Sequence, residues 1–308
     1  MIRPAPSARI APASRIAPTS RIAYVNGRYL PLRDARVSID DRGYQFADGI
    51  YEVCALVDGL LVDAGRHLDR LERSAAALGI VLPMARRPLL LVMRELVRRN
   101  AVQHGLLYLQ ISRGTAPREH AFPATLQAAL VMTVRAQARA AGEARAAAGV
   151  RVITLADQRW ARCDIKSTAL LPNVLAKQAA REAGAYEAWL VDRDGAVTEG
   201  SSSNAWIVDA AGTLVTRERS PAILGGVTRE TLLALALQAG WAVAERRFTV
   251  PEALAAREAF LTSATAFVLP VVAIDGVKIA DGRPGTLTQR LAQLYRDNLP
   301  QERAAGVR

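Results

Sequence analysis

Two kinds of hydrophobic pattern alternate along the chain, and they predict strands and helices. Short apolar runs bounded by Gly, Asn or Asp are typical of strands and hairpins. They predict strands at residues 23–25, 28–30, 49–57, 60–62, 106–113, 126–134, 150–156, 187–192, 196–199, 204–209, 213–216, 259–262 and 271–274. Apolar residues spaced three or four positions apart predict helices at residues 65–78, 88–99, 172–183, 226–239 and 286–297.

Each half of the chain mixes hairpins with helices, and neither half repeats a regular strand-helix unit. This order predicts an α+β fold with two domains. We expect an N-terminal α/β domain at 21–137, a linker rich in Ala, Gly, Arg and Gln at 138–148, and a C-terminal α+β domain at 149–308. Residues 1–20 repeat a six-residue unit rich in Pro, Ser and Arg, which favours a disordered extension. Their lack of acidic residues is also compatible with a transit peptide.

The formal net charge of +11 raises the question of an anionic partner. Beyond the N-terminal segment, Arg alternates with Asp and Glu, which is typical of solvated surface. We expect no nucleic-acid partner, although a basic nucleic-acid-binding protein stays the alternative from another functional class. No apolar run reaches the roughly 18–20 residues of a membrane helix, so we expect no membrane partner. Two cysteines give no disulfide framework, and no signal-type apolar segment is present, so we expect a cytoplasmic protein.

Lysine is rare in this chain, and one lysine stands in an unusual context. Of the 40 basic residues only Lys166, Lys177 and Lys278 are lysine. Where arginine otherwise supplies positive charge, a retained lysine can indicate a need for an amine, because guanidinium stays protonated. Lys177 lies in a helical surface pattern, and Lys278 follows an Asp-Gly turn. Lys166 lies between a strand-like run and an apolar helix start, where burial would favour a nucleophilic amine; a surface lysine with a buried stem is the alternative.

Two further segments have polar patterns that suit a binding pocket. Glu199 ends a predicted strand and is followed by Gly200 and three serines, so its carboxylate could hold a ring nitrogen protonated. A polar turn with an exposed glutamate is the alternative. Gly225 and Gly226 open a predicted helix that continues with Val227 and Thr228, and free N–H groups at a helix start can bind phosphate. A flexible helix start explains this second segment equally well.

Taken together, an amine, a carboxylate for a ring nitrogen and a phosphate cup resemble the fold-type IV pyridoxal-phosphate enzymes. That family includes D-amino acid aminotransferases, branched-chain aminotransferases and aminodeoxychorismate lyases. The resemblance covers about residues 22–298 and rests on five motifs in order. They are Asp41-Arg42-Gly43-Tyr44-Gln45-Phe46-Ala47-Asp48-Gly49-Ile50-Tyr51-Glu52, His67-Leu68-Asp69-Arg70-Leu71, Asp164-Ile165-Lys166-Ser167, Glu199-Gly200-Ser201-Ser202-Ser203-Asn204 and Gly226-Val227-Thr228-Arg229.

The resemblance implies a cofactor, pyridoxal 5'-phosphate, bound between the two domains. It implies that Lys166 is the catalytic residue, bonds covalently to the cofactor and moves the substrate proton. Glu199 would then pair with the pyridine nitrogen, and Leu224 would pack on the ring. The phosphate would be held by Arg70, Val227, Thr228 and Ser263.

The segment 113–120 indicates the substrate subclass. It is similar to the Arg-x-His loop of D-amino acid aminotransferases, which implies that Arg118, His120 and Tyr51 bind the substrate, with Arg118 clasping the α-carboxylate. The expected reaction is a ping-pong transamination between a D-amino acid such as D-alanine and a 2-oxo acid such as 2-oxoglutarate, in a homodimer. An (R)-selective amine aminotransferase, a branched-chain aminotransferase or a lyase of the aminodeoxychorismate type are the alternatives.

Three positions depart from the family pattern. Ala264 stands where D-amino acid enzymes can carry a hydroxyl, so one phosphate contact is in doubt. Val227 and Ala47 are milder variants. None of the three changes the reaction class that the resemblance implies.

Overall fold

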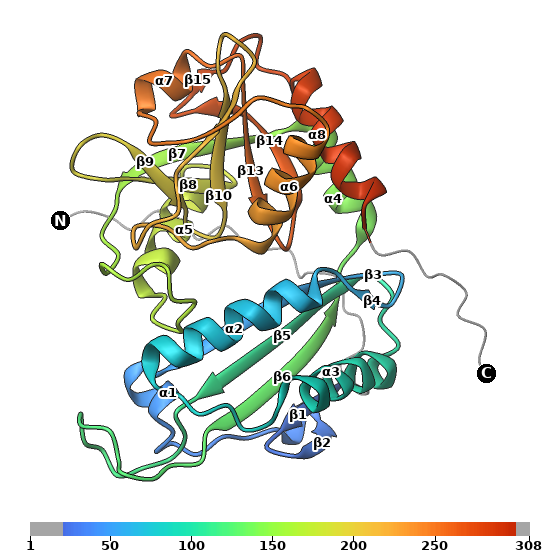
Figure 1. Cartoon of the computed structure of the whole chain (residues 1–308), viewed down its shortest axis with the longest axis vertical. Helices are drawn as coiled ribbons and strands as arrows, with labels where there is room; N and C mark the ends of the chain where they lie inside the picture. Colours follow the sequence, from blue (N-terminus) through green and yellow to red (C-terminus); the bar gives the residue numbers. More distant parts are fainter. Residues whose placement is uncertain (1–20, 300–308) are drawn as a thin grey trace, which may run out of the picture.

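The computed structural model describes residues 21–299, which fold into two lobes around two β-sheets. Figure 1 shows the N-terminal lobe in blue to green and the C-terminal lobe in green through yellow to red. This arrangement agrees with the α+β fold predicted from the sequence. The extension predicted at 1–20 lies outside the described residues.

The N-terminal lobe is an antiparallel sheet of six strands in the order β2-β1-β6-β5-β3-β4. Its strands are β1 (Ile22–Val25), β2 (Arg28–Pro31), β3 (Gly49–Val57), β4 (Leu60–Leu61), β5 (Gly105–Ser112) and β6 (Ala129–Ala136). Helices α2 (Ala64–Leu78) and α3 (Arg86–Asn100) bury their leucine faces against this sheet. The short elements η1 (Leu32–Asp34) and α1 (Arg42–Phe46) connect β2 to β3.

The C-terminal lobe is a mixed sheet of nine strands. Its main path is β12-β11-β10-β13-β14-β7-β8-β9, and β15 pairs with β14. The strands are β7 (Val150–Ala156), β8 (Glu187–Val191), β9 (Val197–Gly200), β10 (Asn204–Val208), β11 (Leu214–Thr216), β12 (Val243–Glu245), β13 (Glu258–Ser263), β14 (Phe267–Ile274) and β15 (Val277–Lys278). The helices are α5 (Leu171–Glu182), α6 (Val227–Gln238), α7 (Val250–Leu254) and α8 (Thr286–Asp297).

The connection between the lobes is helical, which the sequence reading did not predict. The segment expected as a linker, 138–148, contains α4 (Arg139–Ala148), which has no buried residue. Alanine and arginine are strong helix formers, so this composition supports a helix even without an apolar face. The short elements α1, α7 and β12 were also missed, because three to five residues carry too little periodicity to predict an element.

A backbone contact between the lobes holds the Lys166 segment against the edge of β3. The amide of Tyr51 donates to the carbonyl of Lys166 at 3.0 Å, and the amide of Thr168 donates to the carbonyl of Gly49 at 2.9 Å. These two hydrogen bonds form an antiparallel β-bridge between Ile50 and Ser167. Lys166 is therefore fixed by main-chain hydrogen bonds to the opposite lobe.

Candidate active site

A cavity of about 270 Å³ lies between the two lobes. Its walls come from β3 and α2 on one side and from β9, β13 and the start of α6 on the other. The lining includes eight of the residues that the sequence predicted for the site, namely Tyr51, Arg70, Lys166, Glu199, Leu224, Val227, Thr228 and Ser263. Residues far apart along the chain, such as Tyr51 and Lys166, thus meet in one pocket.

Lys166 reaches into the cavity beside Tyr51. The Lys166 Nζ lies 4.1 Å from the centroid of the Tyr51 ring, within the range of a cation–π contact. Its backbone amide also donates to Ser74 Oγ at 3.2 Å, which ties the segment to α2. In contrast, Lys177 Nζ donates to the Tyr186 carbonyl and lies 3.4 Å from Glu187, and Lys278 is exposed in β15. Only Lys166 among the three lysines lines the cavity.

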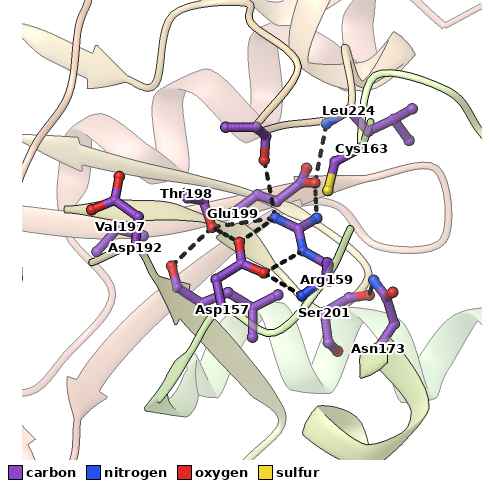
Figure 2. Close-up of polar contacts among 12 residues, drawn as sticks. Asp157, Arg159, Cys163, Asn173, Asp192, Val197, Thr198, Glu199, Ser201 and Leu224 are labelled. Atoms are coloured by element: carbon purple, nitrogen blue, oxygen red, sulfur yellow. Dashed lines mark hydrogen bonds and ion pairs between the residues drawn. The ribbon is translucent and has the colours of Figure 1, made fainter. Parts of the chain in front are cut away.

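Glu199 lines the cavity and belongs to a network of polar contacts (Figure 2). Its carboxylate pairs with the guanidinium of Arg159, accepts from the Leu224 amide at 3.0 Å and accepts from Asn204 Nδ2 at 2.9 Å. Asp157 in turn accepts two hydrogen bonds from the Arg159 guanidinium, at 3.0 and 2.7 Å. The position of Glu199 is therefore set from several directions.

Burial and neighbouring charges have opposite effects on the pKa values of the two carboxyls in this network, Glu199 and Asp157. Burial raises the pKa of the Glu199 carboxyl above its ordinary value, while the Arg159 guanidinium and the Leu224 amide oppose the rise. For Asp157, burial also favours the acid, but hydrogen bonds from Arg159 lower the pKa of that carboxyl. Such a carboxylate, buried and held by donors, is suited to pair with a protonated ring nitrogen.

Arg70 projects from α2 into the cavity as one member of a buried charged cluster. Its Nε and Nη2 donate to the two Glu52 oxygens at 2.8 Å each, and its Nη1 donates to the Gly225 carbonyl at 2.9 Å. His67 Nδ1 lies 2.7 Å from the same Glu52 carboxylate. Burial would raise the pKa of Glu52, but Arg70 and His67 lower it to about 2, so Glu52 is ionised at neutral pH.

The wall beside Arg70 is suited to a phosphate. Helix α6 begins at Val227, and the residue before it, Gly226, provides no side-chain cap, so the first N–H groups, those of Val227 and Thr228, stay available to a ligand. A Cβ on Gly226 would come within 2.0 Å of Asn204 Oδ1, so close packing requires glycine here. These donors, with the Arg70 cation beside them, fit the phosphate of pyridoxal phosphate.

The departure at Ala264 lies in the same wall. Ser263 and Thr265 both line the cavity, and their hydroxyl oxygens are 3.1 Å apart. Thr265 therefore brings a second hydroxyl next to Ser263, one position beyond the alanine. Thr265 is therefore a second hydroxyl on this wall that could contact a phosphate.

Arg118 and His120 lie outside the cavity that their own chain forms. Both side chains are exposed on the connection between β5 and β6, and neither lines the cavity. The Arg118 guanidinium lies 4.8 Å from the centroid of the Phe46 ring, and the His120 ring is 5.5 Å from the same centroid. Within one chain the structure does not bring these two predicted substrate-binding residues to Lys166.

Three charged residues of the site were not assigned a role from the sequence. Glu52 and His67 stand inside the quoted motifs, so the buried pairing of Glu52 with Arg70 was within reach of a charge-pairing argument. Arg159 belongs to no motif and is one of many arginines, and only the structure shows that it pairs with Glu199. Its nearness to Asp157 gave no signal, because Arg and Asp alternate along much of the chain.

Comparison with known proteins decides the family. The model of the amino-transferase class IV family matches residues 49–274. The chain belongs to the class IV aminotransferases. It is 42% identical over 282 residues to D-alanine aminotransferase of Bacillus licheniformis, and the match spans 92% of this chain and 98% of that protein.

Solved structures agree on the fold. A branched-chain amino acid aminotransferase of Escherichia coli matches with a TM-score of 0.85 at 21% identity, over 93% of this chain and 98% of that one. A branched-chain aminotransferase of Thermoproteus uzoniensis, solved with norvaline, matches with a TM-score of 0.79 at 28% identity, over 89% and 93%. The expected α+β fold of this family is thereby confirmed.

Proposed function

We propose that this class IV aminotransferase transfers the amino group between a D-amino acid, such as D-alanine, and a 2-oxo acid, such as 2-oxoglutarate. The observation that carries the proposal is the shared cavity, which Lys166 lines together with the buried Glu199 and Arg70. The substrate class rests on sequence. Identity to a D-alanine aminotransferase reaches 42%, whereas identity to the branched-chain enzyme of Thermoproteus uzoniensis is 28%.

The cofactor of this family is pyridoxal 5'-phosphate, and the residues of the cavity fit it. Arg70, the Val227 and Thr228 amides and the Ser263 hydroxyl would hold its phosphate. Glu199 would pair with its ring nitrogen, and Leu224 would lie against its ring. When bound, the cofactor supplies an electron sink that stabilises negative charge at the substrate Cα.

Lys166 and Glu199 have separate roles in the reaction. Lys166 would hold the cofactor covalently between turnovers, and its amine, when free, would take up and return the proton of the substrate Cα. The Glu199 carboxylate, which pairs with Arg159, would hold the proton on the ring nitrogen and so keep the electron sink strong. The two half-reactions then run by one route in opposite directions, as a ping-pong exchange requires.

The place of Arg118 and His120 supports a homodimer. Both carry donors suited to an α-carboxylate, yet neither lines its own cavity. We propose that a second copy brings them to the cavity, so that each site uses Lys166 of one chain and Arg118 of the other. Tyr51 would contribute a phenol from the same chain as Lys166.

Two finer proposals concern organisation and location. We propose domain bounds of 21–137 and 149–308, which the two sheets support.

A cytoplasmic location is supported by Cys54 and Cys163, which are both free and buried thiols, as is usual in a reducing compartment. Among residues 21–299, no helix is long and apolar enough to cross a membrane.

The decisive test of substrate class compares amino donors. The purified protein with added cofactor receives D-alanine, L-leucine or (R)-1-phenylethylamine, each with 2-oxoglutarate, and glutamate formation is measured. We expect D-alanine to react fastest and K166A to form no glutamate in repeated turnover. Preference for L-leucine would move the chain to the branched-chain subclass, and preference for the amine would remove the carboxylate clamp. Product release without any 2-oxo acid would indicate a lyase.

A further inference from the structure

One buried arginine, Arg42, forms hydrogen bonds with the loop that carries Arg118 and His120. The Arg42 side chain is 3% exposed. Its Nη1 donates to the Glu119 carbonyl at 2.5 Å, and its Nη2 donates to the His120 carbonyl at 3.1 Å. Nη1 also reaches the Ala121 carbonyl at 3.4 Å. Three successive carbonyls of the loop thus converge on one guanidinium.

The charge of Arg42 is balanced inside the same cluster. Its Nε donates to Asp48 Oδ2 at 2.8 Å, and Arg113 donates to both oxygens of Asp48. Burial by itself would raise the pKa of Asp48, but the hydrogen bonds from Arg113 and Arg42 lower it below the ordinary value. Arg113 continues to the carbonyls of Leu78 and Gly79 at 2.8 and 3.1 Å. The cluster therefore connects the loop to the end of α2.

The start of the loop is docked on the same short segment. The Arg42 amide donates to the Gly114 carbonyl at 2.8 Å, and Asp41 forms a β-bridge with Thr115. In Figure 1 the connection between β5 and β6 extends beyond the end of the sheet, next to α1. Its contacts with residues 40–48 therefore supply order that the sheet does not provide.

Helix α1 also carries the ring on which both substrate-binding side chains rest. Phe46 is four residues after Arg42, and its centroid lies 4.9 Å from the Arg42 guanidinium carbon. The Arg118 guanidinium and the His120 ring both lie near this ring, at 4.8 and 5.5 Å. The Arg118 guanidinium and the His120 ring are thus exposed to solvent while both lie against the Phe46 ring.

We propose that Arg42 is a positioning residue for substrate recognition, which fixes the loop 114–122 so that Arg118 and His120 form a preordered receptor for an α-carboxylate. The inference rests on the proposed function, in which this loop serves the site of a second copy. Preordering matters because a mobile loop loses conformational freedom when it binds, which weakens affinity. A planar fork that reaches several carbonyls at once is a property of arginine that lysine lacks.

The test compares R42M and R42K with R28M, a control at an exposed arginine of β2. We expect R42M to raise the D-alanine KM and the inhibition constant of propionate together, roughly tenfold, with kcat changed less than about threefold. R42K keeps the charge beside Asp48 and should fall between R42M and the parent. Trypsin should cleave after Arg118 faster in R42M than in R28M, because cleavage requires a loosened loop.

Unchanged KM and propionate inhibition in a folded R42M would overturn the proposal. Retention of the cofactor's visible absorbance reports the fold, and if R42M loses it, R42K decides by the same two constants. R118A is measured in parallel. If R118A leaves the D-alanine KM unchanged, the carboxylate clamp of the proposed function fails; if R118A raises it and R42K and R42M do not, only the role of Arg42 fails.

Discussion

The guanidinium of Arg159 and the carboxylate of Glu199 form an ion pair in which each side chain is only 6% exposed. Asp157 balances the positive charge on the far side of the guanidinium (Figure 2). Buried charges are stable only when they are paired and hydrogen-bonded. Asp157, Arg159 and Glu199 each have such a partner. Arg159 thus opposes the rise that burial causes in the pKa of Glu199.

Removal of Arg159 should therefore change the pH dependence of the reaction. Burial already raises the pKa of Glu199, and Arg159 opposes the rise, so R159M should raise the pKa further. Glu199 would then take up a proton at a higher pH, and the acidic limb of the kcat/KM profile should move to higher pH. The control is R162M, since Arg162 is exposed and, within residues 21–299, its side chain pairs with Asp164 alone. An acidic limb at the same pH in R159M and the parent would contradict this role.

The charge of Glu199 should matter more than its shape. E199Q keeps the volume and one acceptor oxygen, but a neutral amide cannot hold a protonated ring nitrogen as a carboxylate does. Loss of a hydrogen bond to a charged group costs about 1.5–3 kcal/mol, which corresponds to a fall in kcat of roughly tenfold to a hundredfold. Stopped-flow measurement of the D-alanine half-reaction gives this rate directly, with E143Q, at an exposed glutamate of α4, as control. A parent-like rate in E199Q would mean that Glu199 serves only the local fold.

The sequence predicted the regular elements well, and the reasons are physical. Helix α8 was predicted with its observed bounds, 286–297, because its apolar positions recur at helical spacing. The hairpin of β1 and β2 followed from Asn26-Gly27, since both residues adopt the positive φ that such a turn requires. The helix α4 was not foreseen, because an exposed helix has no apolar stripe.

The site was predicted in part, and what was missed depends on contacts across the fold. Lys166 and Glu199 stood out by residue type and by motif. The Arg159–Glu199 pair spans 40 positions and the Arg42 contacts span 77 to 79, so no local pattern could indicate either. Nor could a single sequence show that Arg118 points away from the cavity of its own chain.

Arg118 should govern affinity for the α-carboxylate, and it should act in trans. R118A should lower kcat/KM for D-alanine roughly tenfold to a hundredfold, mainly through KM, because a charge-assisted pair is lost. An exposed arginine such as Arg33 provides the matched control, R33A. When R118A and K166A chains are mixed, one site of each mixed dimer regains both residues. The activity of the mixture at low D-alanine should therefore exceed the sum of the activities of the two unmixed variants. Strict additivity after mixing would argue against a shared site.

The repeat at the N-terminus should be dispensable. Its low complexity and its lack of large apolar residues other than isoleucine predict that deletion of residues 2–20 leaves folding and turnover intact. Thermal unfolding and D-alanine turnover of the shortened chain would be compared with those of the full chain. A melting temperature lower by several degrees would show that this segment packs on the rest of the protein.

The central claim is that Lys166 holds the cofactor, and chemical trapping tests it most directly. Borohydride reduction of the cofactor-loaded protein fixes the cofactor to the amine that bears it, and peptide mapping then identifies that lysine. The chain offers three lysines, of which Lys166 alone lines the cavity, so K177A and K278A should be labelled like the parent and K166A should not. The account predicts the label on the peptide that contains Lys166; a label on Lys177 or Lys278 would contradict it.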